Sequence, residues 1–559
     1  MTTSLDDALD PTDWMTKIHD NLWGHIEKSM TPDEKGHWSL LNIPVTVILI
    51  PVGIVASMCQ IASHLCQYVP KYFTTLPDPN EDFNSIRKDS RLWSKIDQIQ
   101  EEGKTSQEKD AIEWKKIDAV IGKTKLGHNN PNFSWSVASC TFQDSPQSIE
   151  HSQWRPFIKE KLPENNRWTP DSLLEQYKTP EGRKAVIAKL QELKVNSFRT
   201  SLPWAAIQPT EKEWNGEIIQ RFVELAKDLK KEGIELKLTM HHFSEPAWFF
   251  NKGSFRKEEN LQHFRNFVER AIAPFIENEE PLVSSIYTIN EPGVEGLSRF
   301  VRGAFPPGKS MEFTKAAKHI AGCLKAHNIA YGIIKKINQN VKVGFTHQYL
   351  NLHHANVVLQ PVTTIINRIA NQCIINWLKT GTFRFTMPGV HVHEEIGQLK
   401  ADFMGLQFYS EALIGLLGST SYCEKMTQMP FRENPEGLYK AIIDLFQSCN
   451  ANRGPDAPSM PIEITENGIS TADDTQRGRY IARALYAAYR AAQIIGEENL
   501  TGFTLWSFMR NLEWDMGVEP QDFGAFKDLN SPLKKGSTVY PKAVDAWRAS
   551  LQEDVKIAG

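Results

Sequence analysis

The chain has 559 residues, with 63 Lys and Arg against 67 Asp and Glu and a formal net charge of −4. Hydrophobic residues make up 41% and charged residues 23%, which excludes a wholly disordered, collagen-like or coiled-coil chain. The near balance of charge argues against a nucleic-acid partner, because nucleic-acid binders normally carry a basic excess. At roughly 100–200 residues per domain the length suggests three or four domains, unless one of them is a large α/β barrel.

Cysteine usage and the N-terminus bear on the compartment. The seven cysteines are odd in number, widely spaced and without a C-x-x-C pair, so neither a zinc cluster nor a disulfide framework is expected. Buried free thiols in a reducing compartment are the expectation. The first 39 residues lack a basic n-region, so a cleavable signal peptide is not predicted. Together these features favour the cytoplasm.

An apolar segment near the N-terminus is a reason to consider membrane contact as well as a cytoplasmic location. Residues 40–59 form a run of 20 residues without charge, long enough to cross a bilayer. Pro44, Pro51 and Gly53 interrupt a helix there, which also fits a re-entrant hairpin or an interfacial segment. The alternative is a hydrophobic extension packed on the main domain. Membrane contact through 40–59 is therefore open, and the oligomeric state is not predicted.

From about residue 131 the chain alternates between short β-rich runs and amphipathic helical stretches. This alternation predicts βαβ units and a parallel sheet. We expect a (β/α)8 TIM barrel with long loops over 131–559, preceded by an N-terminal extension, 1–130, that carries the apolar segment and a polar region of linker and helices. The eight expected strands are 135–139, 195–199, 235–240, 284–290, 341–346, 402–407, 462–465 and 501–506, and the expected helices are 181–194, 217–231, 258–276, 313–337, 437–447 and 477–495.

Two glutamates fall where strands of this barrel end. Glu291 lies in the sequence TINEP after the fourth strand, and Glu466 lies in ITENG at the end of the seventh. Chemistry in a (β/α)8 barrel sits at the C-terminal ends of the strands, and these two ends face each other across the mouth. Glycoside hydrolysis needs such a pair of carboxyl groups, one acting as acid and base and the other, in retaining enzymes, as nucleophile.

These motifs resemble those of glycoside hydrolase family one, the β-glucosidase and β-galactosidase family of retaining barrels, over about three quarters of the chain. The resemblance implies that Glu291 is the acid/base and Glu466 the nucleophile, with Asn290 at the sugar 2-hydroxyl. The closing sequence WSFMRNLEW is similar to the family's sugar-binding signature. It implies that Glu513 holds the 4- and 6-hydroxyls, with Trp506 and Trp514 beside the ring.

Four further positions match the family one by one. Arg199 in FRTS resembles the arginine beside the nucleophile, where a cation would keep Glu466 ionised. His242 in HHFSEP matches the sugar-binding histidine, and Gln143 in TFQ matches the first-strand glutamine. Tyr409 in GLQFY matches the tyrosine that hydrogen-bonds the nucleophile.

The sequence also departs from the family around this pair. Gln407 stands where Asn is usual, Phe243 where Trp follows the histidine, Ser145 in place of Glu, and Asp522 in place of the Arg of Arg-Phe-Gly. These changes bear on substrate range and turnover. The Ser-plus-Lys pattern of the family's 6-phosphosugar enzymes is not evident after Trp514, which favours a non-phosphorylated sugar.

The resulting prediction is a retaining β-glycosidase that hydrolyses β-glucosides or related β-glycosides, with a small carbohydrate as its partner. The histidine pairs offer no set of third and fourth ligands at zinc spacing, so no metal and no cofactor are expected. Two alternatives stay open: a weak or inactive barrel that serves as a glycan-binding or membrane-associated module, and a transglycosylase.

Overall fold

The computed structural model describes residues 106–558, apart from gaps at 168–171, 355–358, 416–417, 420–426, 430–432 and 455–456. The apolar segment 40–59 lies outside the described residues. Within them, no helix combines the length and the apolar character that a membrane span requires. Cys140, Cys323, Cys373 and Cys449, the four cysteines in the described part, are all free and buried.

Eight parallel strands close into a barrel, in the order β1-β13-β12-β9-β5-β4-β3-β2. The predicted (β/α)8 barrel is confirmed, and each predicted strand ends within two residues of the observed one. The strands are β1 (Ser134–Ala138), β2 (Ser197–Ser201), β3 (Glu235–His241), β4 (Val283–Ile289), β5 (Lys342–Gln348), β9 (Phe403–Gln407), β12 (Ile462–Asn467) and β13 (Leu500–Trp506).

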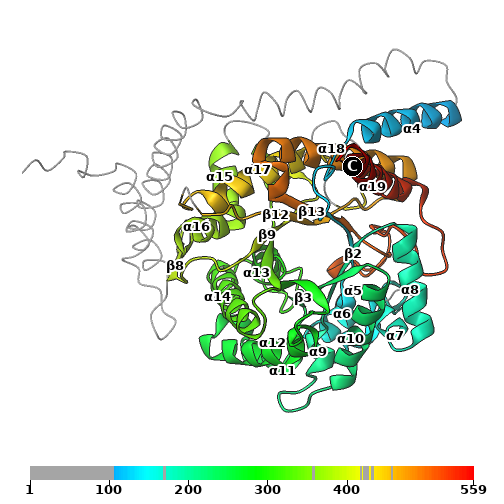
Figure 1. Ribbon diagram of the computed structural model, residues 1–559. Coiled ribbons are helices and arrows are strands. Elements are labelled where there is room, and N and C mark those ends of the chain that lie inside the picture. The colour runs from blue at the N-terminus through cyan, green and yellow to red at the C-terminus, as the bar shows by residue number, and fades with distance from the viewer. Residues whose placement is uncertain are drawn as a thin grey trace, which may run out of the picture.

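Helices surround the barrel (Figure 1). α10 (Gly216–Lys231) illustrates how the sequence sets them: the Asn215 side chain accepts a hydrogen bond from the Glu217 backbone N–H at the start, and basic residues occupy the last turn, where they favour the negative end of the helix dipole. The other large barrel helices are α8 (Pro180–Glu192), α12 (Leu261–Ile276), α14 (Phe313–Ile337), α16 (Cys373–Thr380), α17 (Gly437–Asn450), α18 (Asp474–Ile495) and α19 (Val539–Ala558).

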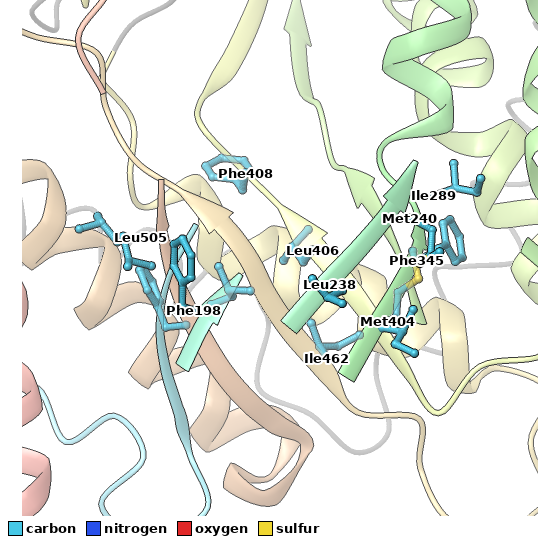
Figure 2. Packing of buried hydrophobic residues seen from close by; sticks show 14 of the residues in the cluster. Phe198, Leu238, Met240, Ile289, Phe345, Met404, Leu406, Phe408, Ile462 and Leu505 are labelled. Atoms are coloured by element: carbon cyan, nitrogen blue, oxygen red, sulfur yellow. The ribbon is translucent and has the colours of Figure 1, made fainter. Parts of the chain in front are cut away.

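The two faces of the barrel strands carry different side chains, as β3 illustrates. Leu238 and Met240 in β3 belong to the apolar cluster that packs between strands and helices (Figure 2). The residues that alternate with them point the other way, because successive strand side chains face opposite sides. One of these, Lys237, donates to Glu463 at 2.5 Å, and both are buried. The inside of this barrel is therefore polar.

Helix α4 (Ser106–Lys123) lies within the 1–130 region of the sequence and packs on the barrel helices α18 and α19. The Trp114 ring lies against Gly478, where an added Cβ would come within 2.9 Å of it. Arg479 donates to Glu113 at 3.4 Å, and Lys542 donates to Asp118 at 2.7 Å. This helix thus contacts the same folded body as the barrel (Figure 1).

Two small sheets in the long loops were not predicted. β7 (Thr382–Met387) and β8 (Val390–Glu395) form an antiparallel hairpin. Its turn is Pro388-Gly389, with φ +77° at the glycine, the position that favours glycine in a tight turn. The other sheet joins β6 (Asn351–His354), β10 (Glu411–Gly415) and β11 (Gly418–Ser419).

Candidate active site

The two glutamates are placed by the ends of their strands. Glu291 lies two residues after the end of β4 in a left-handed conformation, with φ 40° and ψ 61°, and directly precedes α13 (Pro292–Phe300). Its backbone N–H donates to the Thr346 carbonyl of β5 at 3.1 Å, so the turn is tied to the neighbouring strand. Glu466 lies in β12, where the register with β9 shifts between Ile464 and Glu466. Both carboxyl groups are buried.

Glu466 is held by two donors. Arg199 Nη1 donates to its Oε1 at 2.5 Å, and the Tyr409 hydroxyl donates to its Oε2 at 2.5 Å. The guanidinium of Arg199 also lies 4.8 Å from the centre of the Tyr287 ring. Both donors stabilise the ionised carboxylate, because charge-assisted bonds of this kind favour the charged form.

Asn290 is bound to the same arginine. Its Oδ1 accepts hydrogen bonds from Arg199 Nη2 at 2.7 Å, Gln407 Nε2 at 2.9 Å and Thr346 Oγ1 at 3.0 Å. Its Nδ2 is buried and has no hydrogen-bond partner among the described residues. One side of this amide is therefore fixed by protein, and the other retains a donor for a ligand.

Glu291 and Glu466 lie in different environments, which shift their pKa values by different amounts. Burial raises the pKa of Glu291 well above its ordinary value, the charge of Glu466 raises it further, and Arg199 opposes the rise. Burial also raises the pKa of Glu466, but Arg199 and Tyr409 oppose it there. Glu291 therefore holds its proton more strongly, and Glu466 ionises first. A general acid and a nucleophile need a difference in this direction.

The predicted sugar-binding residues gather beside this pair. The His242 ring centre lies 6.2 Å from that of Trp506 and 5.9 Å from that of Trp514. Gln143 Nε2 donates to the Leu512 carbonyl at 2.8 Å, which joins the first strand end to the loop after β13. Gln143 Oε1 and Glu513 Oε2 are buried without a hydrogen-bond partner in the described part. Burial raises the pKa of Glu513 to about 8.

An aromatic wall that the sequence analysis did not identify encloses Trp514. The ring of Phe142 stacks on it at 5.2 Å with an interplanar angle of 7°, and Trp154 and Phe305 lie 5.1 and 5.5 Å away. Phe243, the residue that replaces the usual Trp, lies 5.0 Å from Trp514. The signal that could have found this wall is the cluster of aromatic residues in the loops after β1, β3 and β4.

Two other departures have local explanations. Ser145 Oγ donates to Asp144 Oδ1 at 2.6 Å, and Ser139 donates to the other carboxylate oxygen; burial nevertheless raises the pKa of Asp144 to about 7. Asp522, in place of Arg, forms an ion pair with Lys534 at 2.5 Å. The charge reversal at 522 is thus balanced by a neighbouring cation.

One cluster in the described part has ligand atoms close enough to hold a metal ion: Glu295, His319 and Cys323, all buried. The carboxylate is already bound on both sides, since Arg299 Nη1 donates to Oε1 at 2.9 Å and His241 Nε2 lies 2.9 Å from Oε2. A divalent cation there would also lie near the positive charge of Arg299. The cluster fits an internal ion-pair network better than a metal centre, and we assign no metal.

A closed (β/α)8 barrel with two buried carboxyl groups at the C-terminal ends of β4 and β12, with β5 and β9 between them, is the arrangement of the barrel glycosidases. Comparison with known proteins agrees. The family model described as glycosyl hydrolase family 1 matches residues 130–387 and 395–542. This chain belongs to that family and is a glycoside hydrolase, with a glycoside or carbohydrate as its substrate.

The relatives differ in their named activities. A 6-phospho-beta-galactosidase of Leptotrichia buccalis is 26% identical over 66% of this chain and 86% of its own length. Galactolipid galactosyltransferase SFR2, chloroplastic, of Arabidopsis thaliana is 22% identical over 64% of this chain and 56% of its own length. Among solved structures, a beta-glycosidase from Pyrococcus horikoshii covers 75% of this chain and 95% of its own, with 25% identity and a TM-score of 0.63.

Proposed function

We propose that this chain is a retaining β-glycosidase that hydrolyses β-glucosides or related β-glycosides. Protonated Glu291 donates its proton to the glycosidic oxygen while the carboxylate of Glu466 attacks the anomeric carbon. The bond to the leaving group breaks, and a glycosyl ester forms on Glu466. Glu291, now a carboxylate, then removes a proton from water, which displaces Glu466 and releases the sugar with its configuration retained.

The observation that carries this proposal is the unequal environment of the two carboxyl groups. Glu466 accepts bonds from Arg199 and Tyr409, whereas Glu291 Oε1 is buried without a hydrogen-bond partner among the described residues. An acid needs a raised pKa and a nucleophile needs an ionised carboxylate, and this difference in surroundings supports these roles for Glu291 and Glu466.

A panel of aryl β-glycosides tests the proposal. The wild type should hydrolyse at least one of them, and Glu466→Ala should lose activity by roughly 10⁴-fold or more, as loss of a catalytic nucleophile does. An exposed residue such as Glu279→Ala serves as the matched control and should retain wild-type rates. Equal rates for wild type and Glu466→Ala would overturn the assignment.

We also propose that the sugar carries no phosphate. The Ser-plus-Lys pattern of the family's 6-phosphosugar enzymes is not evident after Trp514, so the residues that would pair with a phosphate dianion there are not supplied. Hydrolysis of an aryl β-glucoside should exceed that of its 6-phosphate in kcat/KM. The reverse order would contradict this part of the proposal.

Transfer to an acceptor hydroxyl is a second candidate, because one relative is named a galactosyltransferase. The same glycosyl ester on Glu466 would then be attacked by an acceptor alcohol instead of water. Product analysis with added sugar or glycerol acceptors separates the two: free sugar as the main product supports hydrolysis, and glycosylated acceptor supports transfer.

A further inference from the structure

The amide of Gln407 lies inside the barrel next to the proposed nucleophile. Gln407 ends β9, is fully buried, and pairs in register with Glu466 on one side and Gln348 on the other. Its side chain reaches Asn290, where Nε2 donates to Oδ1 at 2.9 Å. The usual family residue at this position, Asn, is one methylene shorter, so the long side chain distinguishes this chain.

The orientation of both amides follows from Arg199. A guanidinium has only donors, so the atom of Asn290 that lies 2.7 Å from Arg199 Nη2 must be the oxygen. The group of Gln407 that faces this oxygen must in turn be the NH₂, since two carbonyl oxygens at that distance would repel. Neither amide can be reversed without losing these bonds.

Two atoms are left over on the other side of these amides. Asn290 Nδ2 is a donor and Gln407 Oε1 is an acceptor, and neither has a partner among the described residues although both are buried. Buried polar atoms without partners are unfavourable and call for a ligand or water. A donor and an acceptor on two amides joined by a hydrogen bond suit one hydroxyl group, which both accepts and donates.

We infer that Gln407 is a specificity-determining residue, whose Oε1 accepts the hydrogen bond of the sugar hydroxyl to which Asn290 Nδ2 donates. This inference rests on the proposed function. The family resemblance implies that Asn290 contacts the sugar 2-hydroxyl, and the bonds of Arg199 to both Asn290 and Glu466 agree with a hydroxyl close to the carbon that Glu466 attacks. The shared hydroxyl is then the 2-hydroxyl, and the site favours a free O–H there.

This pairing makes the enzyme selective. A sugar without the 2-hydroxyl leaves both Asn290 Nδ2 and Gln407 Oε1 unpaired, and sites built to bind a hydroxyl reject analogues that lack it. A 2-acetamido sugar has an N–H in place of the hydroxyl, so its nitrogen cannot accept the hydrogen bond of Asn290 Nδ2, and its acetyl group adds bulk beside Gln407. We expect both classes to be poor substrates.

Gln407→Leu and Gln407→Asn test this inference against an aryl β-glucoside and its 2-deoxy analogue. Leucine removes the carbonyl oxygen that accepts the hydrogen bond. Asparagine retains an amide, but its side chain is one methylene shorter, so the carbonyl oxygen no longer reaches the same position. The ratio of kcat/KM for the two substrates should fall by about 10-fold or more in both variants, because only the glucoside loses a bond. An unchanged ratio, with both substrates slowed equally, would mean that Gln407 only supports the fold and would overturn the inference.

The matched control is Gln262→Leu. Gln262 makes the same type of bond, Nε2 to Asn266 Oδ1 at 2.7 Å, on the exposed face of α12. This variant should leave the substrate ratio at the wild-type value.

Binding separates this inference from the proposed function. Deoxynojirimycin retains the relevant hydroxyl, and isofagomine lacks it. Calorimetry should show that Gln407→Leu raises the Kd of deoxynojirimycin by about 10-fold and changes the Kd of isofagomine by less than about two-fold. Absence of turnover on every glycoside would reject the proposed function alone, and this binding difference would still support Gln407. Equal weakening of both inhibitors, or no binding of either by the wild type, would overturn the inference.

Discussion

Arg199 joins Glu466 to Asn290 through two nitrogens of one guanidinium, Nη1 at 2.5 Å from the carboxylate and Nη2 at 2.7 Å from the amide oxygen. The three residues come from β2, β12 and the end of β4, so one planar cation sets the relative positions of three strand ends. A lysine carries the same charge but lacks the fixed fork.

Arg199→Lys should therefore lower kcat/KM by about 10²–10³-fold, the usual effect of losing one preorganised donor at a reacting centre. The loss should fall mainly on kcat, because the ammonium still neutralises Glu466 but does not hold Asn290 as well. Initial rates over a range of substrate concentrations measure this. A change in KM alone would argue against the bridging role.

Tyr409→Phe should change the pH dependence of the reaction. The Tyr409 hydroxyl opposes the rise in the pKa of Glu466 by donating to its carboxylate. Without this bond the pKa of Glu466 rises further, so a higher pH is needed to ionise it. The acidic limb of kcat/KM against pH should therefore move to higher pH, and an unmoved limb would contradict the role assigned to Tyr409.

Asp144 should make the fold less stable at higher pH. Burial raises its pKa from an ordinary 3.8 to about 7 in the folded chain. The folded state thus holds a proton that the unfolded state has lost between about pH 4 and 7, and the free energy of unfolding falls as the pH rises through this range. The contribution is on the order of 4 kcal/mol, at about 1.4 kcal/mol per pKa unit.

Asp144→Asn should remove this dependence. Urea unfolding at pH 4 and pH 8 measures it: the variant should be more stable than the wild type at pH 8, whereas at pH 4 the two should agree to within about 1 kcal/mol. A constant difference between the two proteins across the range would refute the assignment.

Arg299 lies between two buried carboxylates, donating to Glu245 at 2.5 Å and to Glu295 at 2.9 Å. Arg299→Met leaves both negative charges buried without their cation. It should lower the free energy of unfolding by about 3–5 kcal/mol. Lys230→Ala removes an exposed ion pair with Glu280 and should change stability by less than about 0.5 kcal/mol; similar values for the two variants would contradict this account.

The barrel could be predicted because its signals are local. Each strand is a short β-rich run, and Glu291 and Glu466 directly follow or end such runs in recognisable motifs. The contacts that tune the site are not local. Thr346 reaches Asn290 from another strand, and Trp514 is enclosed by rings from the loops after β1, β3 and β4. These contacts depend on how the barrel closes, which no window of sequence reveals.

Buried polar groups were the other feature beyond sequence reasoning. From the sequence alone, charged residues are expected at the surface, because they are rarely buried unless paired. This expectation is wrong for Glu245, Glu295 and Arg299. Each is buried only because the others are, so the network becomes visible when β3, α13 and their loops are placed together. The hairpin of β7 and β8 was missed although its Pro-Gly turn is a known signal.

The proposed mechanism depends on a covalent bond between the sugar and Glu466. Incubation with dinitrophenyl 2-deoxy-2-fluoro-β-glucoside, followed by mass spectrometry of the intact protein and its peptides, tests this directly. We predict one fluoroglucosyl group per chain, on the peptide that contains Glu466 and absent from Glu466→Gln. Label on a different carboxyl group, or turnover of aryl glucosides with inversion and no label, would contradict the mechanism.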